Sequence, residues 1–143
     1  MQVIKQFNTI LPPHFEVNRT QVNVGIVAKT KTIDEVEVEG YEYFTVCFET
    51  PEFYTDDALF EIAKKEARGY ELSKLIIDVD GYTLDADETS QERLSRAYGM
   101  LGDGELMPWK DANNIFVNLP KDTIKSAIIM AGTKQTELWA KYA

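Results

Sequence analysis

The sequence has few of the residues that build metal centres and disulfides. It contains one cysteine, Cys47, and one histidine, His14. A single cysteine excludes a disulfide within the chain, and a zinc site usually needs three or four convergent ligands, commonly His or Cys. A Ser-His-Asp triad would have to use His14, which lies in a segment that we expect to be mobile. The sequence therefore favours a reducing compartment and argues against zinc or triad chemistry.

Long apolar runs are also absent. No stretch approaches the roughly 20 apolar residues that cross a bilayer. The segment Met1–Glu16 has neither an unbroken apolar run nor a small-residue cleavage site, so we expect no secretory signal and no membrane partner. Apolar residues still make up 44% of the 143 residues, which is enough for a hydrophobic core in one domain or in two small ones.

Basic residues are scarce in the middle of the chain. Between Ile33 and Glu88 there are 17 acidic and 4 basic side chains, which gives this stretch a charge of −13 within a total of −9. A strongly negative surface repels phosphate backbones, so we expect no nucleic-acid binding. The simplest interpretation is a solvated acidic surface, which can also steer the protein to a basic partner.

Alternating polarity in the N-terminal half predicts antiparallel strands. Pro12-Pro13 excludes helix near the start, so we expect residues 1–17 to form a partly ordered arm. Gly40 and Pro51 are predicted to end strands, and the short connections favour a meander. The predicted strands are 21–26, 33–39 and 41–50.

Helical periodicity dominates the C-terminal half. Thr55 or Asp56 can cap the first helix, and Gly69 is predicted to end it. Asp80-Gly81 is typical of a type I′ hairpin turn. Gly132 either breaks the last helix or permits a close contact. The predicted helices are 57–68, 89–101 and one that opens at Pro120, and the predicted strands near them are 75–77, 82–84, 106–109 and 115–119.

These elements together predict an α+β protein. An N-terminal antiparallel β-meander would be followed by a small α+β domain with a β-hairpin and two main helices. The predicted domains are residues 1–55, the N-terminal β region, and residues 56–143, the C-terminal α+β domain.

Five carboxylates surround the predicted hairpin, and we interpret them as turn formers and helix caps. The calcium-loop pattern fails because its glycine and its closing glutamate are out of register. Paired carboxylates can hydrolyse glycosides, but no aromatic-lined sugar cleft is indicated. We therefore predict no metal, no cofactor and no catalytic residue. The five carboxylates are Asp78, Asp80, Asp85, Asp87 and Glu88.

Aromatic side chains provide the candidate contact residues. Tryptophan is enriched at binding hot spots, although in a small domain it also serves as a core anchor. Both roles stay open for Trp109 and Trp139. The candidate partner-binding residues are Trp109, Trp139, Tyr41, Tyr43 and His14.

Three features of the C-terminal half follow one another in order. Gly81 and an aromatic residue precede DADETSQERL (85–94), Trp109 precedes the polar turn DANN, and VNLP opens a helix that ends in ELW. In this order they resemble an uncharacterised domain family that tailed bacteriophages and prophages encode beside tail-fibre genes. The resemblance covers about residues 60–143. It implies a tail-associated accessory or fibre-assembly role, and it carries over no catalytic residue.

We therefore expect a non-enzymatic phage protein that binds a tail-fibre or tail-tip component. It would act as an assembly chaperone in the host cytoplasm or remain in the virion tail as a minor structural protein, and homo-oligomerisation is left open. The alternative is a small acidic phage inhibitor of a host defence protein, which the stretch from Ile33 to Glu88 suggests. A hydrolase whose site the sequence does not reveal is a third hypothesis.

Overall fold

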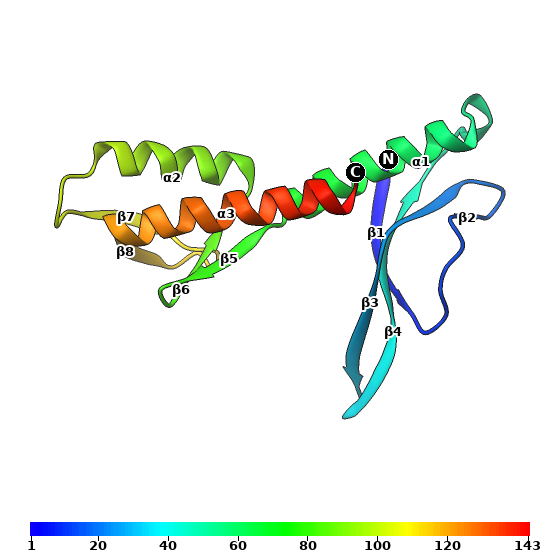
Figure 1. Cartoon of the computed structure of the whole chain (residues 1–143), viewed down its shortest axis with the longest axis horizontal. Helices are drawn as coiled ribbons and strands as arrows, with labels where there is room; N and C mark the ends of the chain where they lie inside the picture. The colour runs from blue at the N-terminus through cyan, green and yellow to red at the C-terminus, as the bar shows by residue number, and fades with distance from the viewer. The chain divides into compact units, whose positions relative to one another are not determined.

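The computed structural model describes all 143 residues, and the chain divides into two compact units. Unit 1 comprises Met1–Tyr70 together with Lys141–Ala143, and unit 2 comprises Glu71–Ala140. Antiparallel strands and three α-helices make up the chain, so the predicted α+β class is confirmed (Figure 1). None of the three helices combines the length and the apolar character that crossing a membrane requires.

Unit 1 is built on a four-stranded antiparallel sheet with the order β1-β4-β3-β2. Its strands are β1 (Gln2–Asn8), β2 (Phe15–Glu16), β3 (Gln21–Ile33) and β4 (Val36–Cys47). β1 pairs with β4 over its whole length, from Gln2 opposite Cys47 to Asn8 opposite Tyr41. The prediction of a partly ordered N-terminal arm was therefore wrong for β1, which forms an edge of the sheet.

β3 and β4 form one long hairpin, whereas the sequence predicted separate strands at 21–26 and 33–39. Asp34 and Glu35 form the turn, with φ angles of 49° and 65° that are typical of a type I′ turn. Gly40 does not end a strand, because it lies within β4 and pairs with Lys29 of β3. A Cβ atom there would lie 2.6 Å from the carbonyl oxygen of Asn8 and 2.7 Å from Cζ of Phe7. The strand needs a glycine at this position for the close approach of Phe7.

The helix α1 (Asp56–Ser73) follows a short 3-10 helix, η1 (Pro51–Phe53). The hydroxyl of Thr55 accepts a hydrogen bond of 3.2 Å from the N–H of Ala58, which confirms one of the two predicted caps. The helix continues through Gly69, which is exposed, so the prediction of a stop there was wrong. An exposed glycine costs a helix only about 1 kcal/mol, and Tyr70 packs on Phe44 with ring centroids 5.8 Å apart.

The core of unit 1 lies between α1 and one face of the sheet. Leu59, Ala63 and Ala67 of α1 are each 0% exposed and pack against apolar side chains of β3 and β4. These helical residues therefore belong to the same compact unit as the strands. The division falls after Tyr70, and not after residue 55 as the predicted domains 1–55 and 56–143 had it.

Unit 2 contains two hairpins and two helices. The turn residues Asp80 and Gly81 have φ angles of 50° and 82°, as the type I′ prediction requires. The hydrophobic core includes Leu84, Leu94 and Leu119, each 0% exposed. The elements are β5 (Ile76–Val79), β6 (Tyr82–Asp85), α2 (Glu88–Met100), β7 (Leu106–Lys110), β8 (Phe116–Pro120) and α3 (Lys121–Lys141).

Local hydrogen bonds explain how the elements of unit 2 begin and end. The carboxylate of Asp111 accepts hydrogen bonds of 2.9 Å from the N–H groups of Asn113 and Ile115, which closes the polar turn between β7 and β8. Asp87 occupies the N-cap position of α2 but makes no side-chain cap bond, contrary to prediction. α3 continues through Gly132, so this glycine does not break the helix. It makes no close contact either, because nothing packs within 4 Å of the place that its Cβ would occupy.

Candidate functional site

Residues from β6, α2 and β7 line a hollow in unit 2. Its volume is about 200 Å³, which is below the range of about 300–1,000 Å³ that is usual for small-molecule pockets. A hollow of this size can accept a side chain of a partner protein. The residues that line it are Asp85, Ser90, Arg93, Pro108, Trp109 and Lys110.

Trp109 has two different surroundings. It is half-buried and packs against the core of unit 2, and it also borders the hollow. The two roles that the sequence left open, core anchor and contact residue, are thus compatible. Pairing with Val117 of β8 fixes the position of Trp109 on β7. A ring held in this way loses little freedom when a partner binds, which suits a binding hot spot.

The charged residues of the hollow are available to a partner. Asp85 and Arg93 are both exposed, and neither forms an ion pair within the chain. Arg93 lies on α2, one of whose other faces carries Leu94 and Ala97 into the core. Arginine combines charge with a flat guanidinium group, and it is enriched at hot spots together with tryptophan.

The face of the β7–β8 hairpin that is opposite to Trp109 carries exposed apolar side chains. Phe116 is 78% exposed and pairs with Lys110, whose Nζ atom lies 5.8 Å from the centre of the phenyl ring. Leu106 is 55% exposed on the same side of the hairpin, and Ile115 is 59% exposed at its turn. Exposed apolar residues grouped in this way mark interaction sites on folded proteins. The hollow and the side chains that line it are called the Trp109 surface below.

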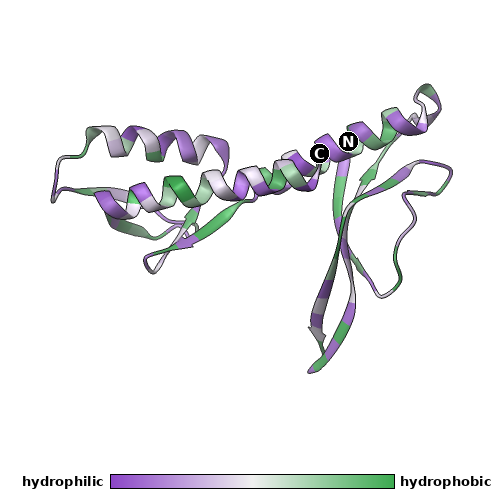
Figure 2. Cartoon of the chain, in the orientation of Figure 1, coloured by the Kyte–Doolittle hydropathy of each residue, from purple (hydrophilic) through white to green (hydrophobic).

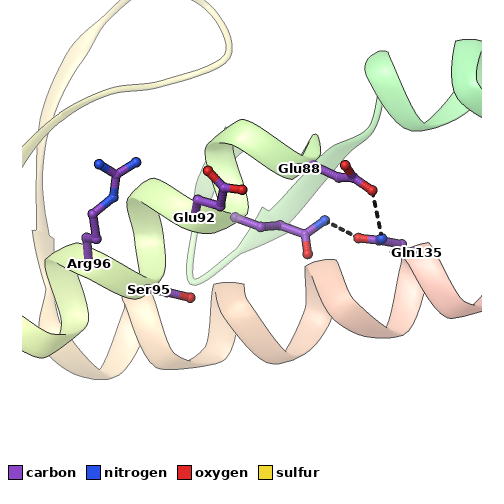
Figure 3. A pocket seen from close by; sticks show the side chains of 6 residues that line it. Glu88, Glu92, Ser95, Arg96 and Gln135 are labelled. Carbon is purple, nitrogen blue, oxygen red and sulfur yellow. Dashed lines mark hydrogen bonds between the residues drawn. The ribbon is translucent and has the colours of Figure 1, made fainter.

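A second hollow lies between α2 and α3 and is open to solvent (Figure 3). The amide nitrogen of Gln91 donates hydrogen bonds to Oε1 of Gln135 at 2.8 Å and to the carbonyl oxygen of Ala86 at 2.9 Å. The amide nitrogen of Gln135 in turn donates to Oε1 of Glu88 at 3.3 Å. These side chains satisfy most of one another's hydrogen-bonding capacity. We therefore assign them the structural role of joining α2 to α3.

The carboxylates around the β5–β6 hairpin bind separate partners. Asp78 accepts a hydrogen bond of 2.7 Å from the hydroxyl of Thr83, and Asp80 accepts one of 2.9 Å from the buried Thr123 on α3. Asp80 thus forms the turn and also holds it against α3. No group of three or more His, Cys, Asp or Glu side chains comes together in a way that could hold a metal ion.

The other four candidate contact residues do not join Trp109 in the hollow. Trp139, on α3, is 49% exposed. Tyr41 is half-buried on β4, and Tyr43 is only 6% exposed, so its ring serves packing in unit 1 and cannot meet a partner. His14 is exposed, and its ring makes an edge-to-face contact with Phe60 at 4.9 Å between centroids.

The sequence did not single out Arg93 or Phe116. Arg93 lies within a polar stretch of α2, where exposed arginines are common, so no local signal marks it. Phe116 alternates with Val117, and this alternation could have indicated that the phenyl ring points away from the core. Comparison with protein-family models, with curated proteins and with solved structures finds no match for this chain.

Proposed function

We propose that this chain is a non-catalytic protein of a tailed bacteriophage or prophage that binds a tail-fibre or tail-tip component through the Trp109 surface. In this role it assists fibre assembly in the host cytoplasm or stays in the virion as a minor tail protein. The proposal combines the resemblance of residues 60–143 to phage-encoded domains with the arrangement of side chains in unit 2.

One observation carries the proposal. Asp85, Ser90 and Arg93 all belong to the stretch DADETSQERL, and Trp109 is the tryptophan that follows it in the phage-like pattern. Asp85, Ser90 and Arg93 lie within nine residues of one another, and together with Trp109 of β7 they line one hollow. Asp85 and Arg93 face solvent and form no ion pair within the chain, so both charges are available to a partner. Their grouping supports a contact site.

The chemistry of the Trp109 surface fits a protein partner. Trp109 offers aromatic area, and Asp85 and Arg93, which form no ion pair in the chain, offer charge-assisted hydrogen bonds around a hollow of about 200 Å³. An apolar side chain of the partner would fill the hollow, and polar groups around it would satisfy the two charges. This arrangement matches the apolar centre and polar rim of protein interfaces.

Co-expression with a tail-fibre protein encoded beside this chain tests the proposal. We expect the two proteins to co-purify, and Trp109→Ala to weaken binding by about 2–4 kcal/mol, as at other hot spots. Arg93→Ala provides a second variant, because an exposed side chain can be removed without harm to the core. Trp139→Ala is the matched control and should bind normally. Absence of a complex, with no change in fibre solubility, would contradict the proposal.

A small acidic inhibitor of a host defence protein is the second candidate. It is favoured by Asp34, Glu35, Glu37 and Glu39, which form no ion pair within the chain. Such an inhibitor would bind a basic host enzyme with an affinity that falls steeply with salt. Trp109→Ala would leave that binding unchanged, which separates the two candidates.

A further inference from the structure

The β3–β4 hairpin of unit 1 extends beyond the other strands as a two-stranded ribbon, which we call the distal hairpin (Lys29–Gly40) (Figure 1). β1 ends opposite Tyr41 and β2 ends opposite Val22, so no strand lies beside either edge of the distal hairpin. A lone two-stranded ribbon is only marginally stable in water. The outward N–H and C=O groups of such an edge can pair with an added strand.

Apolar and charged residues alternate along β4 of the distal hairpin, and the hydropathy colours of the ribbon change with them (Figure 2). Val36 and Val38 point to one face of the ribbon, and Glu37 and Glu39 point to the other. Val36 is 61% exposed. Within the hairpin, Glu37 lies opposite Thr32 and Glu39 lies opposite Thr30. Within the hairpin, each of these two carboxylates therefore lies opposite a neutral threonine.

The two lysines of the distal hairpin do not offset its acidic charge. Lys29 approaches Oε2 of Glu42 to 3.0 Å, and Lys31 lies 4.9 Å from the centre of the Phe7 ring. The four carboxylates of residues 34–39 have no ion-pair partner in the chain. These carboxylates repel one another on a narrow ribbon. A basic strand beside them would therefore lower the electrostatic energy of the hairpin.

We propose that the outer edge of β4 in the distal hairpin binds a strand of a partner protein in which basic and β-branched residues alternate. An added antiparallel strand places lysine or arginine opposite Glu37 and Glu39. It also places valine or isoleucine opposite Val36 and Val38. Main-chain hydrogen bonds hold the strand, and the alternating side chains select it.

A second copy of this chain suits the edge less well. Antiparallel pairing of two β4 edges about Val38 would set Glu37 of one copy against Glu39 of the other, and like charges opposite each other are destabilising. The lysines of β3 are engaged by Glu42 and Phe7. The inference concerns unit 1 and does not depend on the Trp109 surface of unit 2.

Binding of short synthetic peptides to the full chain tests the inference, for example by fluorescence anisotropy. The probe is a peptide of about six residues in which lysine and valine alternate. One control has the same composition with the lysines and valines in two blocks. Another keeps the alternation but carries N-methyl groups on the amides of one edge, which removes their hydrogen bonds. We expect both controls to bind at least about ten-fold more weakly, and equal binding of either control would overturn the inference.

Charge variants provide the second arm of the experiment. The double variant Glu37→Gln and Glu39→Gln should bind the alternating peptide about two- to thirty-fold more weakly, since each cross-strand pair contributes about 0.2–1 kcal/mol. The double variant Glu49→Gln and Glu52→Gln removes two exposed charges outside the distal hairpin and should bind normally. Trp109→Ala should also bind the peptide normally, so failure here is distinguishable from failure of the proposed function. Unchanged affinity in the first double variant, or no peptide binding at all, would overturn the inference.

Discussion

The hydroxyl of Thr45 donates a hydrogen bond of 2.7 Å to Oδ1 of Asn23, across the pairing of β4 with β3. The amide nitrogen of Asn23 donates to the carbonyl oxygen of Pro13 and to Oε2 of Glu16, each at 2.8 Å. Asn23 is 0% exposed. One buried side chain thus joins the segment around β2 to the centre of the sheet, and every polar atom of its amide group has a partner.

Replacing Asn23 with alanine should lower the free energy of unfolding by about 2–4 kcal/mol. The substitution leaves the Thr45 hydroxyl without its acceptor in a buried place and releases the segment that contains Pro13. Urea unfolding followed by circular dichroism measures the loss, and hydrogen exchange shows whether residues near β2 open first. Asn113→Ala, at an exposed turn position, should change stability by less than about 0.5 kcal/mol. An equal loss of stability in Asn23→Ala and Asn113→Ala would contradict the role of Asn23 in joining the β2 segment to the sheet.

Glu42 should make the stability of unit 1 dependent on pH. Burial acts to raise the pKa of this carboxyl, but the hydrogen bond from Lys29 and the charge of Lys5 outweigh it, so the pKa lies below the usual 4.5. A carboxyl with a lowered folded-state pKa stabilises the fold above its unfolded-state pKa. That contribution is lost as the pH falls from about 4.5 through the folded-state value.

The variant Glu42→Gln tests this pH dependence. At pH 7 it should unfold with a free energy about 1 kcal/mol lower than the wild type, because two lysines lose their shared carboxylate. The difference should shrink below pH 4.5 and vanish once the wild-type carboxyl is protonated. Urea titrations of both proteins across this pH range measure it. A difference that stays constant with pH would show that the cause is not charge.

Alanine at Gly132 should stabilise the protein by about 0.5–1 kcal/mol. Gly132 lies inside α3, and no atom is within 4 Å of the place that a Cβ would occupy. Alanine restricts the unfolded chain and favours helix without a clash. Gly69→Ala in α1 should behave similarly. Thermal unfolding measures the gain, and a loss at either position would show that the helix is strained there.

Alanine at Gly25 should have the opposite effect and lower stability by about 2–4 kcal/mol. Gly25 has a φ angle of +64°, and a Cβ there would collide with the hydroxyl of the buried Tyr142. Combining it with Tyr142→Phe should recover part of the loss, because the collision with the hydroxyl is removed, while the contacts with Cζ and Cε1 of the ring and the backbone strain remain. A double-mutant cycle separates the two contributions, and full additivity would contradict the contact.

Local signals in the sequence predicted much of the secondary structure. The type I′ turn at Asp80-Gly81, the polar turn at 111–114 and the cap at Thr55 depend on neighbouring residues only, and all are present. The secondary-structure predictions were wrong where residues far away in the sequence determine the local conformation. β1 is ordered because β4, far along the chain, pairs with it. Gly40 continues a strand because it pairs with Lys29, and its missing side chain leaves room for Phe7.

The candidate site was predictable only in part. Trp109 was singled out because tryptophan is a frequent hot-spot residue, and the structure places it beside the hollow. Nothing in the local sequence indicates that Arg93 reaches the same place, since that depends on the packing of α2 beside β7. Tyr43 has the same residue type and strand spacing as Tyr41, yet the sheet buries only Tyr43.

The place of Tyr142 in the core of unit 1 has a consequence for synthesis. Tyr142 is 3% exposed among side chains of β3, β4 and α1, all of which leave the ribosome earlier. At about 5–20 residues per second, the tyrosine is added roughly 3–14 s after the end of α1. The core of unit 2 likewise includes Ile124, Ala127 and Ala131 of α3, which are added shortly before Tyr142. In the nascent chain, neither unit therefore gains its complete core until the last helix and the residues that follow it have left the ribosome.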